Sequence, residues 1–238
     1  MQIRLDKYLS KYGLGSRKDV KKIIKKKLVK VNNDIIIKDN YKLDTNIDKV
    51  YLNDELIAFK EFVYLMLNKP KDVVCATKDN AHDTVIDLIQ DYDNYDLFPV
   101  GRLDKDTEGL LILTNDGEFA HNLLAPKRHH SKIYKAIVDG KINNEDIEVF
   151  KKGIILDGKL TQSSNLTVLS NEDDSSIVEV EIFEGKFHQI KRMFHYIGKE
   201  VLYLKRISIK GLNLDENLSL GEYRELTEQE LELLKKDL

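Results

Sequence analysis

The chain has 238 residues, of which 42% are hydrophobic and 33% charged, and its formal net charge is −3. This length suits one large domain or two small ones, and the hydrophobic fraction is sufficient for a buried core. Apolar runs are all shorter than the roughly 18 residues needed to cross a bilayer, and the first residues, MQIRLDKYL, lack the apolar stretch of a signal peptide. A single cysteine, Cys75, excludes a disulfide within the chain. The composition therefore predicts a soluble protein of the reducing cytoplasm.

The charge is unevenly distributed along the chain. Residues 1–60 carry 15 Lys and Arg against 8 Asp and Glu, whereas the remaining residues carry 23 against 33. A difference of this size predicts a basic binding module joined to a more acidic body.

The basic segment has the pattern of two short helices followed by strands. Apolar residues spaced over 5–12 predict a first helix that ends at Gly13. The string SRKD at 16–19 is typical of a capping box and predicts a second helix, whose buried stripe is Val20, Ile23, Ile24 and Leu28. Short strands are expected at 29–31, 35–37 and 50–52.

The second helix has a basic face, formed by Arg17, Lys18, Lys21, Lys22, Lys25 and Lys26. Such a face is either an ordinary solvated surface or a binding site for phosphates. The order of elements in RLDKYLSKYGLGSRKDVKKIIKKKLVKVNN resembles an S4 RNA-binding domain. The resemblance implies a binding domain over residues 1–55, a short linker over 56–62 and a second domain over 63–238.

The pattern changes to strands mixed with short helices after residue 62. Strands are predicted at 63–67, 110–114, 132–138 and 176–183, and helices at 84–91, 118–124 and 188–196. A second capping box, TEQE at 227–230, predicts a final helix. The predicted fold class is therefore α+β, with a small αα-β module followed by a mixed sheet with helices.

The string GRLDKDTEGLLILTND at 101–116 raises the question of what Asp104 does. It lies in a polar loop between Gly101 and Gly109, directly before an apolar strand. One interpretation is an ordinary surface ion pair with Arg102, or a turn cap. Zinc clusters, P-loops, Rossmann fingerprints and G-x-S-x-G nucleophiles are absent from the sequence.

Four ordered strings favour a catalytic interpretation. GRLDKDTEGL resembles the G-R-L-D-x-x-T-x-G-L signature of the RsuA/RluA group of RNA pseudouridine synthases. NKP at 68–70, KIY at 132–134 and GKFHQIKRM at 185–193 resemble further elements of that group, in the same order. The resemblance implies a largely antiparallel pseudouridine-synthase sheet and an isomerase that acts on RNA.

The resemblance also implies roles for three residues. Asp104 is the nucleophile, attacking either the sugar or the pyrimidine ring. Lys191 is the cation that keeps this carboxylate ionised where RNA excludes water, although a lysine offers no bidentate fork as an arginine would. Tyr134 stacks on the base and removes the proton from its new attachment carbon.

The reaction breaks and reforms a glycosidic bond without redox chemistry or phosphate transfer, so no cofactor and no metal are expected. The target nucleotide must be flipped out of its stack. Arg102 is expected to fill the vacated space or to hold a phosphate. Further RNA contacts are expected from Lys69, Arg128, Lys132 and Arg192, and His129, His130 and His188 are either RNA contacts or structural residues.

The strings APKRHHSKIY and GEYRELT resemble the RsuA type, which modifies one uridine of 16S ribosomal RNA. The sequence therefore predicts a monomeric 16S rRNA pseudouridine synthase that takes part in ribosome biogenesis. Three alternatives stay open: a large-subunit (23S) rRNA enzyme of the same group, an RNA-binding assembly factor without activity, and a carboxylate glycosidase with Asp106, Glu108 or Asp116 as second acid. Substrate is the property that a shared fold transfers least well.

Overall fold

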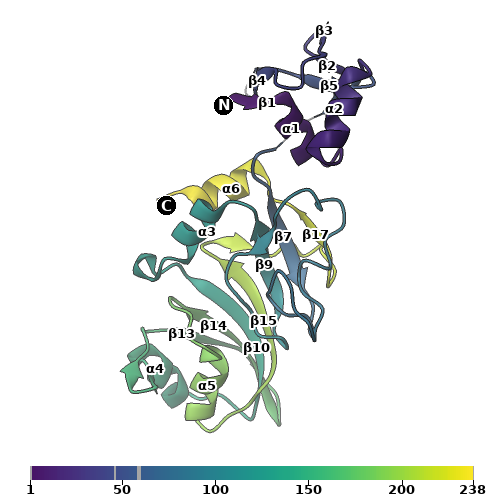
Figure 1. Cartoon of the computed structure of the whole chain (residues 1–238). Helices are drawn as coiled ribbons and strands as arrows, with labels where there is room; N and C mark the ends of the chain where they lie inside the picture. The colour runs from purple at the N-terminus through teal and green to yellow at the C-terminus, as the bar shows by residue number, and fades with distance from the viewer. Residues whose placement is uncertain (1, 46, 58–59, 238) are drawn as a thin grey trace. The chain divides into compact units, whose positions relative to one another are not determined.

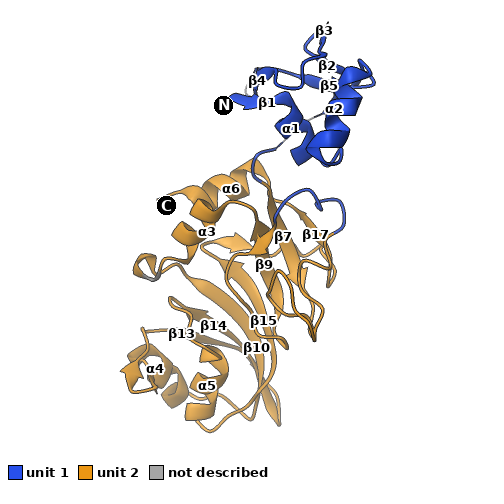
Figure 2. Cartoon of the chain, viewed as in Figure 1, with its two compact units in different colours: residues 1–62, 90–96 blue, residues 63–89, 97–238 orange. Residues whose placement is uncertain are grey.

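The structure is a computed structural model that describes residues 2–45, 47–57 and 60–237. The chain forms two compact units, residues 1–62 with 90–96 and residues 63–89 with 97–238 (Figure 2). Strand β6 (Glu55–Ile57) extends into the predicted linker 56–62, of which residues 58–59 lie outside the described ones. The return of 90–96 to the first unit was not anticipated; there Asn94 Nδ2 donates a hydrogen bond to the Tyr12 carbonyl, at 2.9 Å. No helix among the described residues is long and apolar enough to cross a membrane.

The first unit contains two helices and two small sheets (Figure 1). Its helices are α1 (Leu5–Lys11) and α2 (Arg17–Lys25). Its strands are β1 (Gln2–Arg4) paired with β4 (Lys42–Asp44), and β3 (Asp34–Ile35), β2 (Val29–Val31), β5 (Val50–Leu52) and β6 in that order. The predicted helices are present, and the Ser16 side chain caps α2 by accepting the Asp19 N–H. Val20 and Ile24 are fully buried as predicted, whereas Leu28 is 38% exposed because α2 ends before it.

The second unit is built around a nine-stranded sheet in the order β13-β14-β10-β15-β9-β7-β17, with β16 paired to β15 and β8 to β9. The strands are β7 (Tyr64–Lys69), β8 (Phe98–Pro99), β9 (Glu108–Thr114), β10 (Lys132–Asp139), β13 (Asn165–Asn171), β14 (Ser175–Ile182), β15 (Val201–Ile209), β16 (Leu212–Asn213) and β17 (Tyr223–Glu225). Among the described strands of this sheet, the β15–β9 pair is parallel and the other pairs are antiparallel. The predicted α+β fold with a mixed, mostly antiparallel sheet is confirmed.

Helices cover two parts of this sheet, each with its own apolar core. α3 (Gly117–Leu124) and α6 (Glu228–Lys235) belong to the core that contains β7 and β9. α4 (Asn144–Lys152) and α5 (Gln189–Tyr196) belong to the core that contains β10 and β14. A short hairpin, β11 (Ile155–Leu156) with β12 (Lys159–Leu160), and the 3-10 turn η1 (Pro126–Arg128) complete the unit.

One predicted helix is wrong. Residues 84–91 form turns, with an isolated parallel bridge between Val74 and Thr84. The Asp87 carboxylate accepts hydrogen bonds from the backbone N–H and the hydroxyl of Thr84, both at 2.8 Å. Such local side-chain bonds satisfy backbone groups outside a helix, and this short segment contains few strong helix formers to oppose them.

Candidate active site

The second unit contains a cavity of 740 Å³ between the loop that precedes β9 and the start of α5. Its walls include Asp104, Tyr134, His188, Lys191 and Arg206. The sequence therefore places chemistry-bearing residues from four separate segments on one cavity, and a cavity of this size accommodates a small ligand.

Asp104 faces this cavity with 27% of its side chain exposed. One carboxylate oxygen lies 3.5 Å from Lys191 Nζ and the other lies 3.6 Å from His188 Nε2. Arg102, two residues before Asp104, also lines the cavity. Among the described residues, Arg102 forms no ion pair with Asp104. The surface-pair interpretation of the GRLD string therefore does not hold.

Lys69, the last residue of β7, holds the loop that carries Asp104 in place through hydrogen bonds. Lys69 is fully buried, and its ammonium donates to the carbonyls of Pro70, Asp104, Lys105 and Thr107 at 2.8 to 3.3 Å. Burial lowers the pKa of Lys69, because desolvation disfavours its charged form. Lys69 was predicted to contact RNA, but the structure places its nitrogen among backbone carbonyls, where it fixes the loop.

Gly109 allows β9 to leave this loop beside β15. Its φ is +103°, and a Cβ there would lie 2.2 Å from the carbonyl oxygen of Arg206. Only glycine permits both this conformation and this close approach, so Gly109 is required for the structure of the loop.

Lys191 lies in the first turn of α5 and contacts two carboxylates. Its ammonium is 2.5 Å from Asp106 and 3.5 Å from Asp104. Burial raises the pKa of Asp106, but the hydrogen bond and charge of Lys191 outweigh burial and leave that pKa below its ordinary value. The predicted partner of Asp104 is thus close to it and is shared with a second acid that the sequence did not single out for this contact.

His188 and Phe187 form the edge of the cavity beside Asp104. His188 precedes α5 with a left-handed backbone, φ +49°, which is uncommon outside glycine. Its ring stacks on Phe187 with centroids 3.8 Å apart, and Phe187 is 70% exposed. In this conformation the His188 imidazole lies beside Asp104. The sequence alone left open whether His188 contacts RNA or is a structural residue.

Tyr134 is buried on β10 and lines the cavity. It is paired across the strands with Arg206 of β15. Sequence reasoning missed Arg206, although an arginine at an inward position of the alternating string LYLKRIS is a detectable signal of a buried charge.

The other predicted RNA contacts are differently placed. Arg128 is exposed in η1, and Arg192 pairs with Asp157 at 2.7 Å. Lys132 is half-buried and lines the cavity. The predicted residues of α2 are all exposed, namely Arg17, Lys18, Lys21, Lys22 and Lys25. Two of them form ion pairs, Lys21 with Asp39 at 2.9 Å and Lys22 with Asp19 at 3.2 Å.

Residues 63–196 match the RNA pseudouridylate synthase family, and residues 3–46 match the S4 domain. The protein is therefore an S4-domain enzyme of the isomerase class, and the chain belongs to the RNA pseudouridine synthases. The predicted family is confirmed, and the activity of the protein is the formation of pseudouridine in RNA.

Relatives match over almost the whole chain. An uncharacterized RNA pseudouridine synthase, YtzG of Bacillus subtilis, is 42% identical over 98% of both chains. Ribosomal small subunit pseudouridine synthase A of Escherichia coli is 35% identical over 96% of this chain and 98% of its own. A crystal structure of a pseudouridylate synthase is 34% identical with a TM-score of 0.68, covering 98% of this chain and 99% of that one.

Proposed function

We propose that this protein converts one specific uridine of 16S ribosomal RNA to pseudouridine, with Asp104 as the nucleophile. The observation that carries the proposal is the position of Asp104, whose carboxylate faces a 740 Å³ cavity within 3.6 Å of two nitrogen groups. Similarity over nearly the full chain to a small-subunit enzyme of Escherichia coli supports the 16S substrate.

The ionised carboxylate of Asp104 attacks the flipped nucleotide, at the sugar or at the pyrimidine ring. The N-glycosidic bond breaks, the detached uracil turns, and a bond forms between its C5 and the sugar carbon. The covalent bond to Asp104 breaks as the product forms, which restores the carboxylate. The C5 proton leaves, and N1 of the uracil gains one proton. Atoms and charge balance without an external reactant. This chemistry needs neither a metal nor a redox cofactor.

Lys191 holds a positive charge 3.5 Å from the Asp104 carboxylate, in a cavity from which bound RNA would exclude water. Desolvation favours the protonated form of a carboxylate, and a cation within a few ångströms favours the charged form. Lys191 lies 2.5 Å from Asp106 and 3.5 Å from Asp104, so its charge stabilises both carboxylates of the loop. Tyr134, buried in the same cavity, stacks on the uracil and accepts the C5 proton through its oxygen.

RNA binding is divided between the two units. Arg102, exposed at the cavity, takes the space of the flipped nucleotide or holds its phosphate. The exposed cations of α2 bind further phosphates, which gives affinity with little sequence information. The protein acts as a cytoplasmic monomer on an assembling small subunit.

The proposal is tested with ribosomal RNA that carries tritium at uracil C5. Because that hydrogen leaves in the reaction, purified protein is expected to release tritium from 16S RNA, or from small-subunit particles, and not from 23S RNA. Release from 23S RNA alone would transfer the assignment to the large subunit. Tight binding of both RNAs with no release would contradict the enzymatic assignment. Mapping pseudouridines in cells without the protein then identifies the nucleotide as the one missing site.

A further inference from the structure

The cavity has a basic wall, which we define as Lys132, Arg206 and His130, in addition to the cluster around Asp104. Arg206 is 3% exposed, and its Nε donates to the Leu110 carbonyl at 2.8 Å. Its Nη2 is buried and has no hydrogen-bond partner. No ion pair of Arg206 with a carboxylate is present in the part of the chain that the structure describes. A buried guanidinium without an acid is rare, because burying an unpaired charge is costly.

Strand geometry explains how this arginine reaches the cavity. β10 and β15 are paired from Lys132 with Ile209 to Tyr134 with Arg206, and the register shifts between Ile133 and Tyr134. Such a bulge changes the direction of side chains on the bulged strand. Arg206 thereby lies directly across from Tyr134, on the wall that a flipped nucleotide meets.

Lys132 adds a second cationic donor to the wall, and His130 adds a ring nitrogen. The ammonium of Lys132 donates to the His130 carbonyl at 3.3 Å, and His130 Nε2 is buried without a partner. Burial, followed by the charge of Arg206, lowers the pKa of Lys132. Burial, followed by the charges of Lys210, Lys132 and Arg128, lowers the pKa of His130.

Glu184 is an acid whose charge raises the pKa of Lys132, against the larger effect of burial, but its hydrogen bonds and its ion pair are with other residues. Its carboxylate accepts hydrogen bonds from the Gln162 backbone and from Gln189, both at 3.1 Å, and lies 3.4 Å from Lys186 Nζ. The basic wall therefore holds two desolvated cations that repel each other and that form no ion pair with an acid among the described residues. An anion that enters the cavity would remove this repulsion and supply the missing acceptor.

We propose that the basic wall is a phosphate subsite, which binds one of the two phosphates that flank the flipped uridine. Each nucleotide of RNA brings such an anion, and Arg and Lys are the side chains that hydrogen-bond phosphates most strongly. The subsite would fix the nucleotide between Tyr134 and Asp104. The inference rests on the RNA substrate of the proposed function and does not depend on which rRNA carries the target.

The test measures binding of uridine, uridine 5′-monophosphate and uridine 3′-monophosphate to the full-length protein by calorimetry, at low salt. One monophosphate is expected to bind at least about tenfold tighter than uridine, the ratio that about 1.4 kcal/mol provides. Lys132→Met is expected to reduce this ratio to within about twofold, because it removes the charge-assisted hydrogen bond from the ammonium to the phosphate. Lys135→Met is the matched control, since Lys135 is exposed on the same strand and does not line the cavity.

Equal binding of uridine and both monophosphates, absence of monophosphate binding, or an equal loss in Lys132→Met and Lys135→Met would each overturn the subsite. Arg206→Lys provides a second variant that keeps the charge and loses the fork, and it should reduce the ratio in part. Because this variant also loses the hydrogen bond to the Leu110 carbonyl, its binding is measured below its own melting temperature. Binding is measured without turnover, so a failure of the subsite is distinguishable from a failure to modify 16S RNA. Release of tritium from 16S RNA together with equal binding of uridine and both monophosphates would overturn the subsite but not the proposed function.

Discussion

The two units of the molecule handle charge in opposite ways. In the first unit the cations of α2 are exposed, and Lys21 and Lys22 pair with acids that are also exposed. In the second unit Lys69 is fully buried and Arg206 is 3% exposed. Exposed charge attracts phosphates over a distance but fixes no geometry, whereas buried charge can hold a reacting group in position. Under the proposed function, the first unit would supply affinity for RNA and the second would supply the geometry of the reaction.

The largest expected effect concerns Lys69, the buried cation of the second unit. Lys69→Met removes the donor shared by four carbonyls, including those of Asp104 and Thr107. Because each buried carbonyl without a donor costs about 1–3 kcal/mol, the free energy of unfolding should fall by several kcal/mol. Denaturant unfolding measures that change, and tritium release should fall with it. The control is Lys127→Met, because Lys127 is exposed and no hydrogen bond of its side chain is present in the described chain. Equal stability of both variants would contradict the role of the buried cation.

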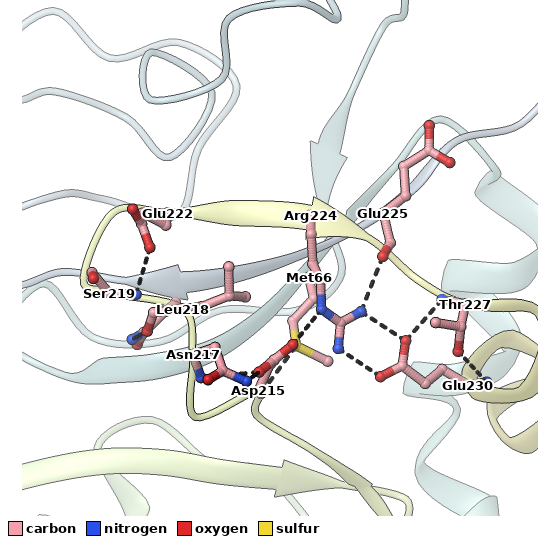
Figure 3. Close-up of polar contacts among 11 residues, drawn as sticks. Met66, Asp215, Asn217, Leu218, Ser219, Glu222, Arg224, Glu225, Thr227 and Glu230 are labelled. Carbon is pink, nitrogen blue, oxygen red and sulfur yellow. Dashed lines mark hydrogen bonds and ion pairs between the residues drawn. The ribbon is translucent and has the colours of Figure 1, made fainter.

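A smaller effect is expected at Arg224, which fastens the C-terminal helix of the second unit. Its guanidinium donates to Asp215 at 2.6 Å and to both oxygens of Glu230 at 2.8 Å (Figure 3). Glu230 in turn caps α6 by accepting the Thr227 N–H, in the predicted capping box. Arg224→Met is therefore expected to lower the free energy of unfolding by about 1–2 kcal/mol near neutral pH.

The Arg224 contacts also predict a dependence on pH. The hydrogen bond from Arg224 lowers the pKa of Glu230, against the effect of burial. A carboxyl group whose folded pKa is depressed contributes stability above its unfolded pKa, about 4.3, and loses it as pH falls through the folded value. Wild-type stability should thus decline more steeply than that of Arg224→Met below about pH 4. Parallel curves for the two proteins would contradict the ion pair.

The smallest effect is expected from the exposed cations of the first unit. Lys18 and Lys25 are exposed and form no ion pair within the described chain. The double variant Lys18→Gln, Lys25→Gln should bind RNA about tenfold more weakly at low salt, and the slope of log K against log salt should become shallower by about 1.4–1.8. Its melting temperature should equal that of the wild type. An unchanged slope would break the comparison, because the first unit would then bind RNA by other means.

Periodic elements could be predicted from the sequence because their signals are local. The predicted helix at 188–196 and strand at 132–138 correspond to α5 and β10 within one residue at each end. β15 was not predicted, because its identity depends on pairing with β10 and with β9, which lies about a hundred residues earlier. The capping box of α4, Asn143 with Asp146, was a detectable signal that was missed.

The site was predictable where strings of the sequence resemble the motifs of a known family. Asp104, Tyr134 and Lys191 line one cavity as the resemblance implied. The function of a lysine, in contrast, depends on burial. Lys69 and Lys132 were both expected at the RNA surface, yet the first is enclosed by carbonyls and the second is half-buried in the basic wall. Lys69 ends β7, which is buried along its whole length, so no alternation of apolar and polar residues indicates that its side chain is desolvated.

The loop before β9 contains two aspartates that contact Lys191, Asp104 and Asp106. The central claim is that Asp104 is the one that reacts. The direct measurement is tritium release from C5-labelled 16S RNA by Asp104→Asn and Asp106→Asn, with RNA affinity measured in parallel. Both acids contact Lys191, so the pair controls for the loss of one charge beside it. Asp104→Asn should release no tritium while binding RNA within a few-fold of the wild type, and Asp106→Asn should still release it. Turnover by Asp104→Asn, or loss of folding and binding together with activity, would contradict the account.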